Sequence, residues 1–194
     1  MSDIAHPPHI RLAWRRTDAP DAARALLGEL LAPLGWDSVL GASPLGAPIS
    51  SWLEARGLSV SLSQTAGIAA CAVMAGGSVG VDVEAVDAGV NAMAVARDRL
   101  NAGAVARLAS STDRLGDFFR LWTLNEAALK ALGVGFATPA GIAVSLDPPS
   151  VRGETPAGFA WHVFEIAVGP AHRMAVVALT PANVEPELVI EVTG

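Results

Sequence analysis

The chain has 194 residues, 52% of them hydrophobic, and its 13 basic and 19 acidic side chains give a net charge of −6 at pH 7. That apolar content can fill the core of one domain or of two small ones. The acidic balance argues against a nucleic-acid-binding protein, because neutralising phosphates requires a basic surface. The N-terminus lacks the apolar region of a signal peptide, and no apolar run reaches the ~18 residues of a membrane span. With a single cysteine, Cys71, there is also no disulfide framework, so we expect a cytoplasmic protein without membrane contact.

The first 87 residues predict a strand, a helix, a long loop and three further strands. Leucines form an apolar stripe along the helix, and Asp18 or Asp21 can cap its start. The pair Gly76-Gly77 is typical of a hairpin turn, so the last three strands are predicted to form a meander. The predicted ranges are 10–14 for the first strand, 17–36 for the helix, 37–57 for the loop, and 58–65, 67–75 and 78–86 for the last strands.

The second part of the chain repeats this order, with helices first and strands after them. Residues 91–132 predict two or three helices, broken near Gly103 and Ser110, and strands are expected at 141–146, 159–169 and 172–180. We therefore predict an α+β fold of two similar halves, residues 1–87 and 88–194, each with a helix packed on a small antiparallel sheet. A ligand site is expected at the interface between the halves.

The segment "VGVDVEAV" places Asp82 and Glu84 two residues apart in a predicted strand. Side chains alternate between the two faces of a strand, so both carboxylates are expected on one face and the intervening valines on the other. Neighbouring carboxylates raise one another's pKa unless a cation lies between them. Taken alone, the pattern is also typical of an ordinary solvated strand face.

The segment "LWTLNEAALKALGVG" contains Lys130, the single lysine among the thirteen basic residues. Lys130 follows Glu126 by four residues in a predicted helix, and Trp122 lies one turn earlier on the same face. A common surface ion pair would have the same spacing. The pairs Asp82/Glu84 and Glu126/Lys130 lie about 40 residues apart, and together they carry more information than either does alone.

Together with "VSLSQT", these segments resemble the phosphopantetheinyl transferases of the larger, pseudo-twofold, surfactin-synthetase-activating type. That family shows a serine-leucine-serine-histidine segment, a glycine-x-aspartate-x-glutamate strand, and a tryptophan-x-x-lysine-glutamate-alanine helix ending in lysine-alanine-x-glycine. The resemblance covers roughly residues 44–138. It implies transfer of phosphopantetheine from coenzyme A to a serine of a carrier protein.

The resemblance also implies roles for individual residues. Mg²⁺ would be bound by Asp82, Glu84 and Glu126 together with the coenzyme A pyrophosphate. Glu126, or a water that it positions, would take the proton from the carrier serine, and Lys130 would stabilise the departing 3′,5′-ADP. The implied coenzyme A contacts are Ser63, Gln64, Asn125 and Lys130. An internal duplication makes a monomer the expected oligomeric state.

Three positions depart from the family pattern, and each loses a positive charge expected near coenzyme A. Gln64 stands in place of a histidine, Asn125 in place of a lysine, and Ala47 in place of a basic residue before a proline. Replacement charge could come from an arginine elsewhere in the chain. The candidates are Arg15, Arg16, Arg56 and Arg120.

Two hypotheses follow from these departures. The first is a divergent phosphopantetheinyl transferase. The second is a transferase-like protein of a natural-product pathway, repurposed for another reaction or for binding a small molecule or a carrier protein, without coenzyme A transfer.

Overall fold

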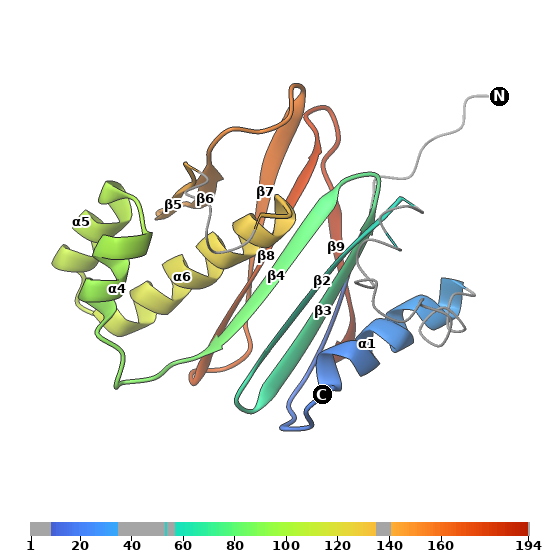
Figure 1. Ribbon diagram of the computed structural model, residues 1–194, viewed down its shortest axis with the longest axis horizontal. Helices are drawn as coiled ribbons and strands as arrows, with labels where there is room; N and C mark the ends of the chain where they lie inside the picture. Colours follow the sequence, from blue (N-terminus) through green and yellow to red (C-terminus); the bar gives the residue numbers. More distant parts are fainter. Residues whose placement is uncertain (1–8, 35–52, 54–56, 135–140, 194) are drawn as a thin grey trace.

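The computed structural model describes residues 9–34, 53, 57–134 and 141–193, whose strands form three sheets (Figure 1). The first sheet has the strand order β2-β3-β1-β9 and the second the order β4-β8-β7, while β5 and β6 form a hairpin. The predicted α+β class is confirmed, but the first sheet is mixed rather than antiparallel, because β9 pairs with β1 in parallel. The strands are β1 (His9–Arg15), β2 (Leu58–Thr65), β3 (Ile68–Ala75), β4 (Ser78–Ala85), β5 (Ala143–Leu146), β6 (Pro149–Arg152), β7 (Phe159–Ile166), β8 (His172–Pro181) and β9 (Glu187–Thr193).

Each of the two larger sheets carries one helix on its outer face. Helix α1 packs on β3 and β1, and the longer helix α6 packs on β4 and β8, with α4 and α5 grouped around α6 at its N-terminal end (Figure 1). Among the described residues, no helix combines the length and the apolar character that a membrane crossing requires. The helices are α1 (Ala22–Leu31), followed by a 3-10 turn (Ala32–Leu34), α4 (Ala92–Arg99), α5 (Ala102–Ser110) and α6 (Arg114–Ala131).

The two larger sheets share one layout. In the first sheet the strands that surround α1 in the chain lie in the order β2-β3-β1, and in the second the strands that surround α6 lie in the order β7-β8-β4. In the first sheet, β1, which precedes α1 in the chain, therefore lies beside β3. In the second sheet, β4, which precedes α6, lies beside β8 in the same way. Strand β9 has no counterpart in this scheme and extends the first sheet at β1.

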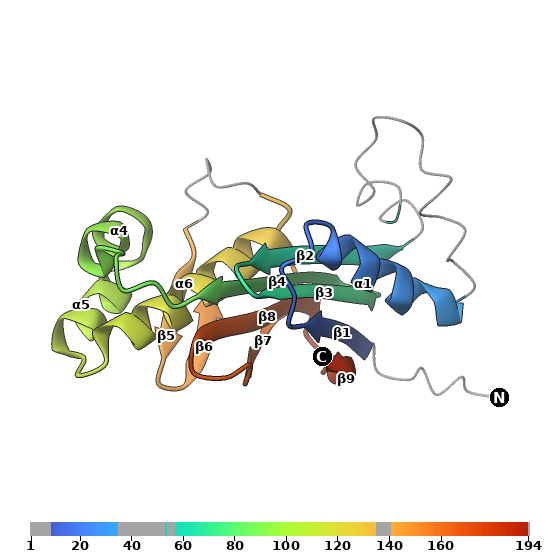
Figure 2. The same cartoon turned by 90° about the horizontal axis from the view of Figure 1, so that it is seen from below.

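One apolar cluster joins the inner faces of both sheets. It contains Leu12 from β1, Ala70 from β3, Val81 from β4 and Val176 from β8, all fully buried. The outer face of each sheet contributes to a separate cluster with its own helix, α1 or α6. Figure 2 shows β2 and β4 side by side between the two helices.

Strands β2 and β4 meet through side-chain hydroxyls rather than through a backbone ladder. Backbone N–H groups of alternate β4 residues donate to hydroxyls of alternate β2 residues, at 2.9, 2.9, 3.1 and 3.5 Å along the strands. Every pair is 20 residues apart, so the two strands run parallel. We call the four β2 residues the hydroxyl seam; they are Ser59, Ser61, Ser63 and Thr65.

The prediction that β2, β3 and β4 form one meander is wrong. Strands β3 and β4 flank Gly76-Gly77, but they belong to different sheets, and β4 pairs with β8. The turn leads β4 across to the β2 edge because the valines of β4 are buried in the inner cluster while its free N–H groups find hydroxyl acceptors. A glycine pair therefore joins two sheets here, although its sequence resembles a hairpin turn.

Gly80 sets the distance between β4 and α6. A Cβ atom at this position would lie 1.9 Å from the Ala127 carbonyl oxygen and 2.7 Å from the Ala131 nitrogen. Only glycine allows the helix backbone to lie directly on the strand here. The close contact places the last two turns of α6 beside the outer face of β4.

The predicted elements are largely confirmed, with two strands missed and one cap misassigned. Residues 91–132 form three helices as expected, whereas β6 and β9 were not predicted. Asp21 occupies the N-cap position of α1 but makes no side-chain cap, and Asp18 instead accepts a hydrogen bond from Gly67 N. The Gln64 amide oxygen serves α1, accepting from Ala23 N at 3.4 Å. The predicted loop at residues 37–57 lies outside the described residues apart from Leu53 and Gly57.

Candidate functional site

The candidate site lies where α6 crosses β4 beside the hydroxyl seam. Asp82 and Glu84 are on the outer face of β4, as the alternation predicts, and the valines that alternate with them along the strand enter the inner cluster. Asp82 is 4% exposed and Glu126 on α6 is also 4% exposed. Two carboxylates from different elements are thus buried in the same region.

Lys130 bridges three groups that come from two strands. Its Nζ donates to Asp82 Oδ1 at 2.8 Å, to the Val81 carbonyl at 2.9 Å and to the Leu62 carbonyl at 3.4 Å. The carbonyls belong to the facing edges of β4 and β2, so the ammonium lies across the seam. Lys130 therefore pairs with a carboxylate of the strand, whereas its i, i+4 spacing suggested a pair with Glu126.

Ser63 contacts the same oxygen of Asp82. Its hydroxyl donates to Asp82 Oδ1 at 3.1 Å and accepts the N–H of Val83 at 3.1 Å. Asp82 Oδ2 is buried and has no hydrogen-bond partner among the described residues. One oxygen of this carboxylate is held by two donors, and the other is left available.

The environment of Glu126 disfavours its charged form. Burial and the charge of Asp82 raise the pKa of Glu126 to about 7, although Asn125 and Lys130 act in the opposite direction. The Asn125 side chain is 7% exposed, and its Nδ2 lies 3.5 Å from Glu126 Oε1. This amide is a weak neutral substitute for a cation.

Glu84 completes the acidic group. Burial, followed by repulsion from Asp82, raises the pKa of Glu84 above its usual range, while a hydrogen bond from the Trp122 side chain lowers it. Trp122 is itself stacked on Phe118, with ring centroids 5.9 Å apart. The position of this indole one turn before Glu126 was noted from the sequence, but its contact with Glu84 was not predicted.

Gln64 is next to Ser63 in the chain, but its side chain contacts another element. The side chain is exposed, and its Nε2 donates to the Ala19 carbonyl at 2.7 Å, just before α1. The structure therefore joins Asp82, Glu84, Glu126, Lys130, Ser63 and Asn125 into one region and places the Gln64 amide beside α1. Ala47, the third departure from the family pattern, lies outside the described residues.

The arginines considered as replacement cations have other partners. Arg15 pairs with Glu29 at 2.9 Å, Arg16 donates to the Val168 carbonyl at 2.7 Å, and Arg120 pairs with Glu165 at 2.7 Å. Arg56 lies outside the described residues.

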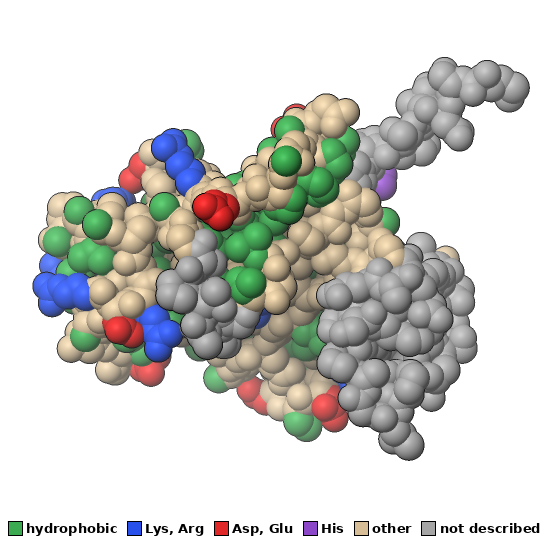
Figure 3. All heavy atoms as spheres, turned by 45° about the horizontal axis from the view of Figure 1, so that its top comes forward, with side chains coloured by type: hydrophobic (Ala, Val, Ile, Leu, Met, Phe, Trp, Pro, Cys, Tyr) green, Lys and Arg blue, Asp and Glu red, His purple; other side chains and the backbone are tan. Residues whose placement is uncertain are grey.

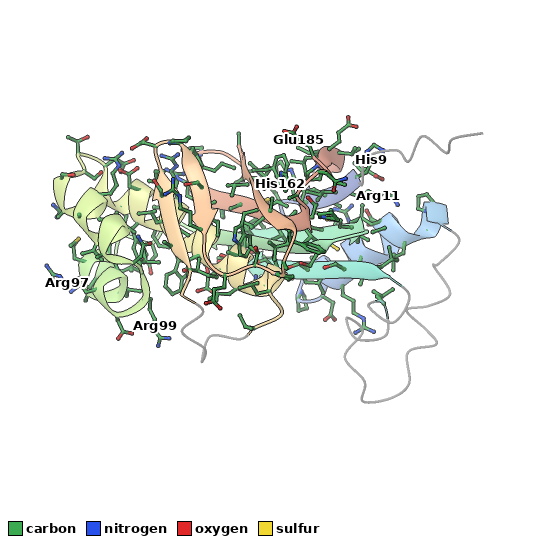
Figure 4. The ribbon with its side chains drawn as sticks, turned by 90° about the horizontal axis from the view of Figure 1, so that it is seen from above. His9, Arg11, Arg97, Arg99, His162 and Glu185 are labelled. Carbon is green, nitrogen blue, oxygen red and sulfur yellow. The ribbon has the colours of Figure 1, made fainter. Side chains whose placement is uncertain are left out.

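Other basic side chains gather away from this region. On the face shown in Figure 3 they cluster at the end formed by α4 and α5. Arg97 and Arg99 are at this end, and His9 and Arg11 are at the opposite end (Figure 4). Of the basic side chains in the described residues, Lys130 is the one that contacts a carboxylate of the site.

An open pocket of about 540 Å³ adjoins Lys130 at the C-terminal end of α6. Its wall combines backbone-rich turns with apolar side chains, and it begins where the hydroxyl seam ends. Lining residues include Gly57, Ser59, Val60, Gly77, Lys130 and Leu132.

The acidic group has the chemistry of a hard-cation site without a preformed cage. In residues 9–34, 53, 57–134 and 141–193, no three potential ligands stand in a metal-binding arrangement. Carboxylate oxygens are nevertheless the ligands that Mg²⁺ prefers, and Asp82 Oδ2 is buried and unpaired. These donors fit a divalent hard cation.

Two comparisons with known proteins complete this description. A search of curated protein sequences found no match to the chain. A family model of the 4′-phosphopantetheinyl transferase superfamily matches residues 78–177, which run from the start of β4 into β8 and contain both the Asp82/Glu84 pair and the Glu126/Lys130 pair. The match spans more than half of the sequence, so the chain belongs to the 4′-phosphopantetheinyl transferase superfamily.

Proposed function

We propose that this protein transfers the 4′-phosphopantetheine group from coenzyme A to a serine of an acyl or peptidyl carrier protein. One observation carries the proposal: Asp82, Glu126 and Lys130 meet where α6 crosses β4, within the region that matches the superfamily. Phosphopantetheine transfer is the general chemistry of that superfamily. The finer assignment rests on these side chains and on the resemblance.

We propose that the reaction depends on Mg²⁺, held by Asp82, Glu84 and Glu126. The unpaired Asp82 Oδ2 and the raised pKa values of both glutamates support this ligand set, since buried carboxylates that lie close together repel one another until a cation binds between them. When bound, the ion would neutralise charge on the coenzyme A pyrophosphate.

Side chains of the site accept the proton and stabilise the leaving group during transfer. The carrier serine oxygen attacks the phosphorus bonded to the pantetheine arm, and the bond from that phosphorus to 3′,5′-ADP breaks. Glu126, or a water that it holds, accepts the serine proton. The positive charge of the Lys130 ammonium stabilises the leaving phosphate. Such a compact cation is not exchangeable with the planar guanidinium of arginine, which agrees with the single lysine of this sequence.

We also propose the larger, pseudo-twofold subtype, with the active site between two similar halves in a monomer of the cytoplasm. The shared layout of the two sheets supports an internal duplication. The sequence suggested a division between residues 87 and 88, whereas the strand order favours one before β4, because β4 pairs with β8 of the second half. The resemblance implied Ser63, Gln64, Asn125 and Lys130 as coenzyme A contacts, and we keep Gln64, Asn125 and Lys130 as the proposed contacts of this subtype.

The test combines a binding and a transfer measurement. We expect titration calorimetry to give micromolar binding of coenzyme A that requires Mg²⁺, and mass spectrometry to detect a phosphopantetheine mass gain on at least one of a panel of apo carrier proteins. The absence of binding at millimolar coenzyme A would contradict the proposal.

A second candidate function is supported by the side chain of Gln64. Its amide contacts the backbone beside α1, and the three described arginines considered as replacement cations are engaged elsewhere. A transferase-like protein that binds another small molecule or a carrier protein, without coenzyme A transfer, would have these features. Mg²⁺ binding without any binding of coenzyme A would favour it.

A further inference from the structure

Ser63 differs from the other members of the hydroxyl seam. All four hydroxyls accept an N–H from β4, but in the described residues Ser63 alone also donates to a carboxylate, Asp82 Oδ1 at 3.1 Å. The resemblance to the transferase family implied that Ser63 contacts coenzyme A. In the structure this side chain connects the seam to the acidic group.

The hydrogen-bonding capacity of Ser63 is largely used by these contacts. A serine hydroxyl has one proton to donate, and here it is directed to Asp82 Oδ1. The hydroxyl also accepts from Val83 N, which fixes the oxygen relative to the strand. Donation to a phosphate would break the contact with Asp82.

The consequence for Asp82 is a defined orientation. Ser63 and Lys130 donate to the same oxygen, Oδ1, and thereby leave Oδ2 without a partner in the described part of the chain. Val83 directly follows Asp82 in β4. The Ser63 hydroxyl therefore contacts both the strand backbone, at Val83 N, and the Asp82 carboxylate. Groups that orient metal-binding carboxylates in this way strongly affect metal affinity.

We propose that Ser63 is a positioning residue for Asp82, which keeps one carboxylate oxygen free for a divalent cation, rather than a direct contact of a coenzyme A phosphate. This inference rests on the proposed function, because it takes Asp82 as a metal ligand. It deepens that function by assigning to the seam a role in metal binding.

Ser61 provides a matched control. Its hydroxyl accepts from Val81 N at 2.9 Å, as Ser63 accepts from Val83 N, and its side chain is buried, but it does not contact Asp82. Ser61→Ala removes a seam hydrogen bond alone, and Ser63→Ala removes a seam hydrogen bond together with the carboxylate contact. Ser63→Thr keeps the hydroxyl and tests rescue.

The experiment measures the affinity of the full chain for Mn²⁺ by calorimetry, without coenzyme A. We expect Ser63→Ala to weaken Mn²⁺ binding by about 10–100-fold, the range found for groups that orient metal ligands. Ser61→Ala should stay within about twofold of the wild type, because its site is separate from the ligands. Ser63→Thr should recover most of the affinity.

A second measurement compares coenzyme A with dephospho-coenzyme A, which lacks the 3′-phosphate, at saturating Mn²⁺. A positioning role predicts equal losses for both ligands in Ser63→Ala. Unchanged Mn²⁺ affinity, with a loss for coenzyme A but not for the dephospho form, would overturn the proposal in favour of a phosphate contact. Equal weakening of Mn²⁺ binding in Ser61→Ala and Ser63→Ala would also overturn it.

The transfer assay separates this inference from the proposed function. A wild type that binds Mn²⁺ but modifies no carrier protein would contradict the transfer reaction, while a selective loss of Mn²⁺ affinity in Ser63→Ala would still support positioning. Full transfer activity of the wild type would support the proposed function. Unchanged Mn²⁺ binding in Ser63→Ala would at the same time overturn the positioning role.

Discussion

The pairs α1/β1 and α6/β4 occupy equivalent places in the two larger sheets, but their charges are reversed. The outer face of β1 presents Arg11 and Arg15, and Arg15 pairs with Glu29 of α1. The outer face of β4 presents Asp82 and Glu84, beside the lysine of α6.

The free edges of the two strands are also completed in different ways. Strand β9 adds a backbone ladder to β1, whereas among the described residues the free edge of β4 meets hydroxyls and the Lys130 ammonium. The two equivalent strands of the shared layout thus carry different sets of charged side chains.

The largest expected effect is on the rate of transfer and compares one glutamate of α6 with one glutamate of α1. Glu126→Gln on α6 should lower the rate of carrier modification by about 10²–10⁴-fold, the contribution of a general base. The matched change on α1, Glu29→Gln, should leave the rate unchanged. The measurement is the rate of mass gain of a carrier that the wild type modifies. Undiminished transfer by Glu126→Gln would remove its assigned role.

Gly80→Ala tests how closely α6 must lie on β4. The new Cβ would overlap the Ala127 carbonyl, so we expect the free energy of unfolding to fall by roughly 3 kcal/mol, at the upper end of overpacking effects. Urea titration gives this value. Gly103→Ala in α5 is the control, because its Cβ would meet only the Asn101 side chain at 3.2 Å. A small effect at Gly80 would mean that helix and strand can separate without cost.

Double-mutant cycles compare the ion pairs of the two regions. The side chains alone of Lys130 and Asp82 are 30% and 6% exposed, whereas those of Arg15 and Glu29 are 36% and 41% exposed. The cycle of Lys130→Met with Asp82→Asn should give a coupling of about 1.5–3 kcal/mol, as for buried hydrogen bonds to charged groups. The cycle of Arg15→Ala with Glu29→Ala should give less than about 0.5 kcal/mol. Equal coupling free energies for the two ion pairs, measured by urea unfolding, would contradict the expected difference between the two regions.

The smallest effect concerns the β1 edge and depends on pH. A hydrogen bond from Arg11 lowers the pKa of Glu191 on β9 below its usual value. The stabilisation is therefore present above the unfolded-state pKa of about 4.3 and is lost as the pH falls through the lower, folded-state pKa. The difference in unfolding free energy between wild type and Glu191→Gln should shrink between about pH 5 and pH 3. A constant difference over this range would show that the pair does not contribute.

The sequence predicted local features well and long-range pairings poorly. The period-two pattern correctly placed Asp82 and Glu84 on one face, and the helical period correctly gave α6. The partner of Lys130 could not be found in this way, because it depends on the crossing of α6 and β4 at Gly80.

Strand β9 was missed for a related reason. Its partner β1 lies at the other end of the chain, and no local sequence pattern indicates a parallel pairing between strands so far apart in sequence. The serines of β2 were visible as an alternating polar face, but only the position of β4 turns them into acceptors.

The hydroxyl seam also bears on self-association. An edge strand with free N–H and C=O groups is a template on which a second chain can add a strand. On β4 the outward N–H groups are occupied by hydroxyls, and the Val81 carbonyl is occupied by the Lys130 ammonium. A neighbouring molecule that approaches this edge meets no free donors along these positions. The arrangement that holds the two sheets together thus also protects the chain from strand-by-strand aggregation along the β4 edge.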